Sequence, residues 1–227
     1  MSATKKDNPS HNGDTEDGKS ERSEFSAPSG SLKSGRLVLA SAVTQMELCA
    51  NPLLDDLYQA RFKRQTPHIW LHENTVSIQF RRFRFLEGLA NLSGPLAEIS
   101  LHGSIPWEIE FRKGVSHLDA DLRQLQLRSL DVLSGANRIR LMLSRPPGTT
   151  YIYISGGISR GIILVPADAG VSLRVSSGAT NLVFDNQHFG AIGGETSLQS
   201  PHFTSTTGRF DICIAGGASN LTISRES

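Results

Sequence analysis

One short stretch of this 227-residue chain matches the local pattern of a serine hydrolase. Residues 157–161 read Gly-Ile-Ser-Arg-Gly, which fits the G-x-S-x-G pattern of a nucleophile elbow with Ser159 as the reacting hydroxyl. Such an elbow needs a helix directly after the serine, and an acid and a histidine further along the chain. Residues 162–165 are instead Ile-Ile-Leu-Val and Pro166 follows, which predicts a strand and its end. The sequence therefore favours a structural role for Ser159.

Two carboxylates form a second candidate site. Asp119 and Asp121 alternate with apolar residues, so both side chains are expected on the outer face of one strand. Their Cα atoms would lie about 6.5–7 Å apart, which suits a bound cation or an acid–base pair. This spacing keeps open a carbohydrate-binding or carbohydrate-active β-helix that uses the two carboxylates. Charged residues are also ordinary on a solvated strand face, where Arg123 and Arg128 are available as ion-pair partners.

Two further groups match a binding site only in part. His68 and His72 have the spacing of a zinc pair on a helix, but their stretch has the pattern of a strand, where they would lie ~13 Å apart. Basic residues lie among phenylalanines over 61–64 and 80–85, a basic–aromatic cluster that includes Arg81, Arg82 and Arg84 and would suit an anionic polymer. We expect instead a strand surface with arginines outside and phenylalanines in the core. No cofactor or metal site is predicted.

The elements that would position these residues follow from a twelve-residue motif that occurs six times. Each copy has a small residue at its centre, here called position 0: Ala42, Gly114, Gly135, Gly157, Gly178 and Gly217. Apolar residues occupy positions −5, −3, +1 and +6 in every copy, and a small polar residue occupies position +2. Position +4 is apolar in every copy but the fourth, where it is Gly161, so we expect a local defect or bulge there.

This periodicity predicts two short strands joined at a corner. Alternation places positions −5 and −3 on one face and +4 and +6 on one face, and the small central residue lets both halves face inward. Glycine is favoured at such a corner because it tolerates a positive φ or a close backbone approach. The central residues from Gly114 to Gly178 recur at intervals of 21, 22 and 21 residues. We therefore predict an all-β, parallel β-solenoid of ~21-residue coils, with the position +2 residues stacked in a polar column.

Composition bounds the domain organisation and the partners. Residues 1–34 are polar and mixed in charge, which predicts a disordered tail before one solenoid domain over 35–227, less regular over 35–106 and regular over 107–227. A net charge of +1 argues against a nucleic-acid partner. With no signal peptide and no apolar run long enough to span a membrane, we expect a cytoplasmic protein without an integral membrane segment, and peripheral membrane association stays open. Cys49 and Cys213 are expected as unpaired outward thiols.

Several of the repeated segments resemble a known family. They are Gly-Val-Ser-His-Leu at 114–118, Ser-Gly-Gly-Ile-Ser at 155–159, Phe-Gly-Ala-Ile-Gly-Gly-Glu at 189–195 and Ala-Gly-Gly-Ala-Ser-Asn-Leu at 215–221. They are similar to the bacterial toast-rack and putative-adhesin proteins and to the C-terminal domain of LiaF-type cell-envelope stress regulators. The resemblance covers about 36–227 and implies a right-handed, strand-rich solenoid that is not an enzyme. Our hypothesis is therefore a bacterial scaffold or regulatory domain that binds a protein partner or associates with itself.

Overall fold

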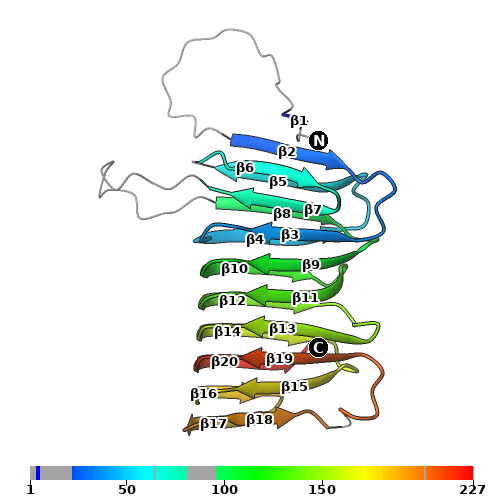
Figure 1. Cartoon of the computed structure of the whole chain (residues 1–227). Coiled ribbons are helices and arrows are strands. Elements are labelled where there is room, and N and C mark those ends of the chain that lie inside the picture. Colours follow the sequence, from blue (N-terminus) through cyan, green and yellow to red (C-terminus); the bar gives the residue numbers. More distant parts are fainter. Residues whose placement is uncertain (1–3, 6–21, 64, 81–95, 202, 227) are drawn as a thin grey trace, which may run out of the picture.

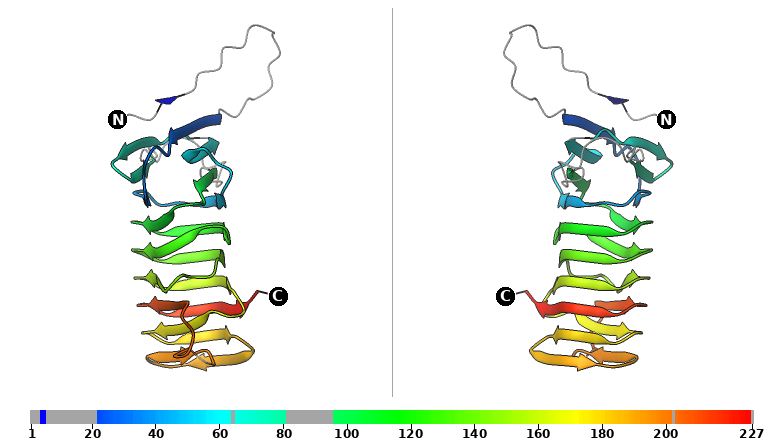
Figure 2. Two further views of the ribbon diagram at one scale, coloured as in Figure 1. Left: turned by 90° about the vertical axis from the view of Figure 1, so that its right-hand side faces the viewer. Right: turned by 90° about the vertical axis from the view of Figure 1, so that its left-hand side faces the viewer.

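The structure, a computed structural model, describes residues 4–5, 22–63, 65–80, 96–201 and 203–226. The described residues contain strands and turns and no helix, and the strands form two sheets that enclose one apolar core (Figures 1 and 2). Sheet A comprises nine strands: β3 (Gly35–Leu39), β6 (His68–His72), β7 (Thr75–Gln79), β9 (Pro106–Phe111), β11 (Gln126–Val132), β13 (Thr149–Ile154), β15 (Gly170–Val175), β18 (Thr196–Gln199) and β19 (Arg209–Ile214). Sheet B comprises eleven: β1 (Thr4–Lys5), β2 (Arg22–Pro28), β4 (Gln45–Asn51), β5 (Asp56–Lys63), β8 (Leu96–His102), β10 (Val115–Leu122), β12 (Ala136–Leu143), β14 (Ile158–Val165), β16 (Ala179–Phe184), β17 (Gln187–Ile192) and β20 (Ala218–Arg225).

Each copy of the motif forms one rung, meaning one strand in each sheet at the same level of the stack. The first half of a copy lies in sheet A and the second half in sheet B, as in β9 and β10 or β11 and β12. Neighbouring copies pair in parallel with equivalent positions opposite each other, for example Leu118 with Ile139 and Ile139 with Gly161. This confirms the predicted all-β fold, the corner and the in-register stacking of the copies. The right-handed winding and the ~21-residue coil stay predictions.

The copies do not stack in sequence order, which corrects the sequence-based expectation. The sixth copy, β19 and β20, lies between the fourth, β13 and β14, and the fifth, β15 and β16. In Figure 1 the red strands of the sixth copy separate the yellow-green fourth copy from the yellow fifth one. Residues 185–208, which separate the fifth and sixth motifs in the sequence, therefore do not lie between the rungs of these two motifs. This segment forms β17 and β18, which lie outside the fifth copy.

The first two copies are likewise neighbours in space although 72 residues separate their centres. β3 pairs in parallel with β9, and β4 pairs in parallel with β10. The intervening chain forms β5 to β8 on the outer side of the first copy, and within it β6 and β7 form a hairpin with Glu73 in its turn. The long spacing between the first and second motifs is thus explained by these four strands, which extend the stack beyond the first copy.

Antiparallel strands form both ends of the stack. β17 and β18 pair antiparallel with β16 and β15 at one end, while β5 and β6 pair antiparallel with β8 and β7 at the other. β2 adds a further antiparallel strand on β5, so the expected tail of residues 1–34 is corrected over residues 22–28. Two apolar side chains are enough to dock this short polar strand: Ala27 is buried, and Phe25 packs edge-to-face on Phe62 at 5.9 Å between ring centroids.

Candidate functional site

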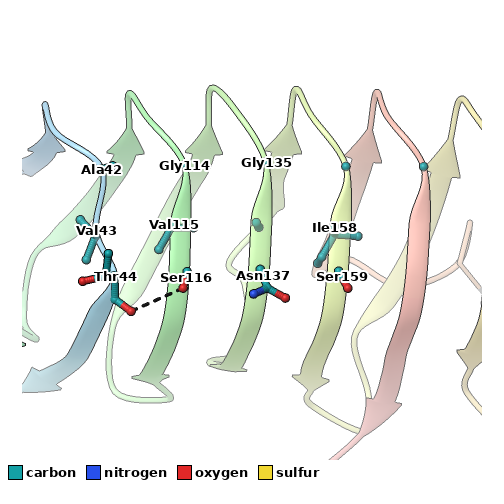
Figure 3. Close-up of a pocket in the computed structure, with 13 residues that line it drawn as sticks. Ala42, Val43, Thr44, Gly114, Val115, Ser116, Gly135, Asn137, Ile158 and Ser159 are labelled. Atoms are coloured by element: carbon teal, nitrogen blue, oxygen red, sulfur yellow. Dashed lines mark hydrogen bonds between the residues drawn. The ribbon is translucent and has the colours of Figure 1, made fainter. Parts of the chain in front are cut away.

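A shallow groove of about 460 Å³ crosses the stacked corners from the first copy to the sixth (Figure 3). Small residues at position 0 form its floor: Ala42, Gly114, Gly135, Gly157 and Gly217. Val115, Ala136 and Ile158 at position +1 are buried beside the floor, because that position points into the core. The polar residues of position +2 follow as a row in which Ser116, Asn137 and Ser159 are paired in register. Gly178 lies at the same corner of the fifth copy, beyond the groove.

The glycines at the corner are required by close backbone contacts between rungs. A Cβ atom on Gly156 would lie 2.7 Å from a backbone nitrogen of the next corner, and one on Gly216 would lie 2.6 Å from backbone atoms of Gly156 and Gly157. A Cβ on Gly157 would lie 3.0 Å from the carbonyl oxygen of Gly217. Among the position 0 glycines only Gly178 has a positive φ, at 83°. Close backbone approach therefore requires glycine at Gly156, Gly216 and Gly157, and the expected positive φ applies to Gly178, whereas a Cβ on Gly114, Gly135 or Gly217 would lie no closer than 3.4 Å to a neighbouring rung.

In five of the six copies the corner has a left-handed residue three positions after its centre, and this residue was not predicted. His117, Arg138, Arg160, Asn181 and Asn220, all at position +3, have φ between 50° and 56°. Each interrupts the alternation of burial, so that residues +1 and +4 both face the core and +3 faces solvent. This is a one-residue left-handed kink at the same position of neighbouring rungs, which stay in register across it, and it supplies the slip in period that the sequence showed. Asparagine in two copies was the available signal, since asparagine tolerates this conformation better than most residues.

The groove lies in a stripe of the surface that carries no acidic residue. Positions −2 to +3 of the six copies contain no aspartate or glutamate, but they contain Arg112, Lys113, Arg138 and Arg160. Arg112 is bound to Glu110 at 2.7 Å. Within the described part of the chain the other three basic residues have no carboxylate partner, and both Arg138 and Arg160 are exposed. The rims of the groove are therefore positively charged in a protein whose net charge is only +1.

At the corner of β10, hydrogen bonds orient His117 so that it does not activate the neighbouring Ser116. Arg138 Nη1 donates to His117 Nε2 at 2.7 Å, since a guanidinium cannot accept. The imidazole is then neutral with its proton on Nδ1, which lies 2.9 Å from Ser116 Oγ and donates to it. A ring arranged in this way cannot take the proton of Ser116. Ser159, the serine of the G-x-S-x-G match, is the second residue of strand β14, with no helix after it, and pairs with Asn137 and Ser219.

The two predicted carboxylates lie on the outer face of β10, outside the groove. Arg123 binds Asp121 through two nitrogens, at 2.6 and 2.9 Å, and the same guanidinium contacts Glu226 at 3.0 Å. The hydrogen bond from Arg123 lowers the pKa of Asp121, which is the opposite of what a general acid needs. Asp119 is exposed and stacks between Glu47 and Arg140. This arrangement gives the carbohydrate alternative no support.

The remaining predicted residues are placed as follows. Arg81, Arg82 and Arg84 lie outside the described residues. In the part of the basic–aromatic cluster that the structure describes, Arg61 pairs with Glu24 and Lys63 with Glu98, while the ring of Phe62 is buried against Phe80. His68 and His72 lie at the two ends of the five-residue strand β6. Cys49 and Cys213 are free thiols on the outer faces of β4 and β19.

Comparison with known proteins gives one family and a similar fold. The profile of the family described as the N-terminal domain of toast_rack, DUF2154, matches residues 16–163. A "putative cell adhesion protein" from Clostridium sporogenes ATCC 15579 superposes with a TM-score of 0.71 at 17% identity, over 92% of this chain and 100% of that chain. A "putative adhesin" from Bacteroides fragilis NCTC 9343 is aligned with a TM-score of 0.31 at 11% identity, over 92% of this chain and 98% of that one. Comparison with curated protein sequences gives no significant match. No helix among the described residues is long and apolar enough to cross a membrane.

Proposed function

Because this chain belongs to the family of the toast_rack N-terminal domain, we propose that it is a non-enzymatic interaction module, a bacterial scaffold or regulatory domain that binds a protein partner through the corner groove. The observation that carries this proposal is the acid-free, positively rimmed stripe along the stacked corners. The assignment of the similar Clostridium sporogenes protein to cell adhesion agrees with a binding role. The hydrogen bonds of His117 and Ser116 support recognition rather than turnover.

The groove best fits an extended acidic segment of a partner. The backbone groups of the corners are already paired between rungs, as in the bonds from Val115 N to Gly135 O at 3.2 Å and from Ala136 N to Gly157 O at 2.9 Å. A ligand therefore meets side chains rather than free backbone donors. Neighbouring rungs are ~4.8 Å apart, so five corners span about 20 Å, the length of roughly six extended residues. The partner would cross the strands and place carboxylates near Arg138, Arg160 and Lys113.

The charges of the rims would set the orientation and rate of binding more than its strength. Exposed ion pairs contribute about 0.2–1 kcal/mol each, so three of them supply only part of a useful affinity. The remaining binding free energy would come from small side chains of the partner that fit against the glycine floor. Larger side chains, on the partner or on the floor, would clash. Attraction between the basic rims and an acidic segment also weakens as salt screens it. Binding should therefore weaken with ionic strength.

A peptide titration tests the proposal. A fluorescent eight-residue peptide of alternating glutamate and serine is titrated by anisotropy against the full chain, beside a peptide with glutamine in place of glutamate. We expect the acidic peptide to bind, and the double variant Arg138→Glu with Arg160→Glu to weaken binding at least tenfold. Arg128→Glu, an exposed arginine on the outer face of sheet A, is the matched control and should bind like the wild type.

Two results would contradict the groove as the binding site. In one, both peptides bind equally well, which would show that charge does not contribute. In the other, the control variant loses as much affinity as the double variant, which would place the peptide elsewhere. We expect both variants to fold, because Arg138 and Arg160 are exposed and make no core contact. Far-UV circular dichroism of each variant checks that the strands are retained.

A further inference from the structure

The stack ends at β17 and β18, and both strands have one open edge. β17 pairs with β16 and β18 pairs with β15, and each is the last strand of its sheet (Figure 1). The backbone groups that point away from the stack along these two strands have no strand partner in the described chain. Residues 187–192 and 196–199 thus form two parallel lines of unpaired donors and acceptors, joined by the corner at Gly193 and Gly194. Such edges readily pair with another strand.

The two edge strands at this end of the stack carry neither charged side chains nor proline. β17 reads Gln-His-Phe-Gly-Ala-Ile and β18 reads Thr-Ser-Leu-Gln, with no lysine, arginine, aspartate, glutamate or proline in either strand. β2 near the opposite end of the stack contains Arg22, Glu24 and Pro28. Charged side chains and proline are the usual means by which proteins prevent edge-to-edge pairing. The absence of charged side chains and proline from both β17 and β18 distinguishes this end of the stack from the other end.

Apolar side chains are also left partly uncovered at this end. Phe189 and Ile192 on β17 and Leu198 on β18 pack on the core of the rung above, yet remain only half-buried. Equivalent residues of inner rungs, such as Leu182 and Phe184, are almost completely buried because a further rung covers them. One more layer would bury the three side chains in the same way. The end therefore combines unpaired backbone with apolar surface that lacks its covering rung.

We propose that two copies of this chain associate through this end, with β17 pairing antiparallel to the partner's β17 and β18 to the partner's β18. The two edges are held in facing sheets about 10 Å apart, so a single extended peptide can pair with only one of them. A second copy presents two edges at the same separation and satisfies both. A two-fold axis perpendicular to the stack brings each strand against itself, and the contact closes as a dimer.

The other end of the stack would be a poor partner for this surface. There β2 and β1 extend sheet B by two strands beyond β5, while sheet A ends at β6, so the end is stepped rather than flat. Self-pairing also brings like residues together, which uncharged strands allow. The charged residues nearest the end are already paired within one chain: Arg174 with Glu195 at 3.8 Å and Arg225 with Asp185 at 2.9 Å. The proposed dimer is separate from the corner groove and does not depend on it.

Light scattering coupled to gel filtration tests the dimer. The full chain at about 100 µM is expected at twice its mass of 24.7 kDa. Two charges placed on the open edges, Ala191→Lys with Ser197→Lys, should return it to the mass of one chain, because both positions are exposed on β17 and β18. The matched control is Tyr153→Lys with Ile162→Lys, which places one lysine on the exposed face of each sheet in the middle of the stack and should leave the dimer intact.

Hydrogen exchange provides a second measurement that does not depend on the variants. In a dimer the amides of β17 and β18 gain protection as protein concentration rises, while those of β6 at the other end do not. A wild type with the mass of one chain overturns the proposal. So does an edge variant that remains a dimer, or a dimer that only the face variant disrupts. Peptide binding by the edge variant reports on the groove separately, so failure of the dimer and failure of the groove can be told apart.

Discussion

The position of the sixth copy between the fourth and the fifth can be tested at Gly161. This buried residue replaces the apolar residue found at position +4 in the other copies, and the side chains of Ile158 and Leu221 fill the space. A Cβ on Gly161 would lie 2.6 Å from Ile158 Cδ1 and 2.9 Å from Leu221 Cδ1. Gly161 is opposite Leu221 because β14 pairs with β20. If the copies stacked in sequence order, Leu182 of the fifth copy would be its neighbour instead. At the expected defect, Ile158 of the same rung and Leu221 of the neighbouring rung thus fill the space beside Gly161.

The contacts give the size of the effects. Leu221 is 0% exposed, so Leu221→Ala should cost about 3–5 kcal/mol, towards the upper part of the usual range, because Gly161 has no side chain that can move into the cavity. Gly161→Ala should cost about 1–3 kcal/mol, since its methyl group overpacks against two side-chain ends. In the double variant the new methyl occupies space that the leucine has left. The combined loss should therefore be smaller than the sum of the single losses by about 1–2 kcal/mol.

The assay is a double-mutant cycle measured by urea unfolding. Far-UV circular dichroism and tryptophan fluorescence are followed together, and coincident curves establish that each variant unfolds in one cooperative step. Leu182→Ala combined with Gly161→Ala is the control cycle. Leu182 pairs with Leu221 and lies two strand spacings, about 10 Å, from Gly161, so those two losses should add within about 0.5 kcal/mol. Coupling of Gly161 to Leu182 rather than to Leu221 would refute the observed strand order.

Three further predictions concern the corner, the end of β20 and the core. Gly216→Ala should destabilise the chain by more than 2 kcal/mol in urea unfolding, since its Cβ would lie 2.6 Å from backbone of the neighbouring corner, whereas Gly114→Ala, at 3.4 Å, should cost less than about 1 kcal/mol. Arg225→Ala should lower stability by about 1–3 kcal/mol, because the guanidinium binds Asp185 at 2.9 Å and the carbonyls of the loop before β15; an unchanged unfolding midpoint would contradict this role. Tyr58→Phe should raise stability by about 1 kcal/mol at pH 7, since the buried hydroxyl has no hydrogen-bond partner within the described chain. Burial raises the pKa of Tyr58 to about 12, so the folded state holds the proton more tightly; stability should fall as pH rises from 10 towards 12 in the wild type and less in the variant.

The two strands of each rung could be predicted from the sequence because burial alone determines their pattern. Leu130 and Val132 before a corner and Ile139 and Leu141 after it are apolar for the same reason: each points into the space between the sheets. An outward charge between two inward apolar residues is visible as period two. The slip at the corner was visible as well, as the change of phase between positions −3 and +4. What this pattern could not specify was the residue that adopts the left-handed conformation.

The order of the rungs could not be read from the motif because the copies are nearly equivalent. Either face of the fifth copy could accept the sixth, since the inward residues match in both arrangements. The short turn at Asp185 and Asn186 determines the order of the rungs, because it folds β17 back onto the outer edge of β16. With that edge occupied, β20 can pair with β16 only on the inner side, next to β14. A positive φ of 50° at Asp185 fits the tight hairpin turns that Asp and Asn favour, so the signal was present in two residues rather than in the repeat.

Because the left-handed residue at position +3 faces solvent, the groove can carry side chains of its own on a regular scaffold. The backbone at position +3 is fixed by the ladder on both sides of it, while the side chain faces solvent and makes no core contact. Histidine, arginine and asparagine therefore occupy equivalent places in different copies without altering the stack. Positions −5, −3, +4 and +6 have no such freedom, because each fills a space next to the same position of the neighbouring rung. The residues that would determine the ligand of the proposed groove site are thus those that the repeat leaves unspecified, and Arg138 and Arg160 carry its charge without altering the core.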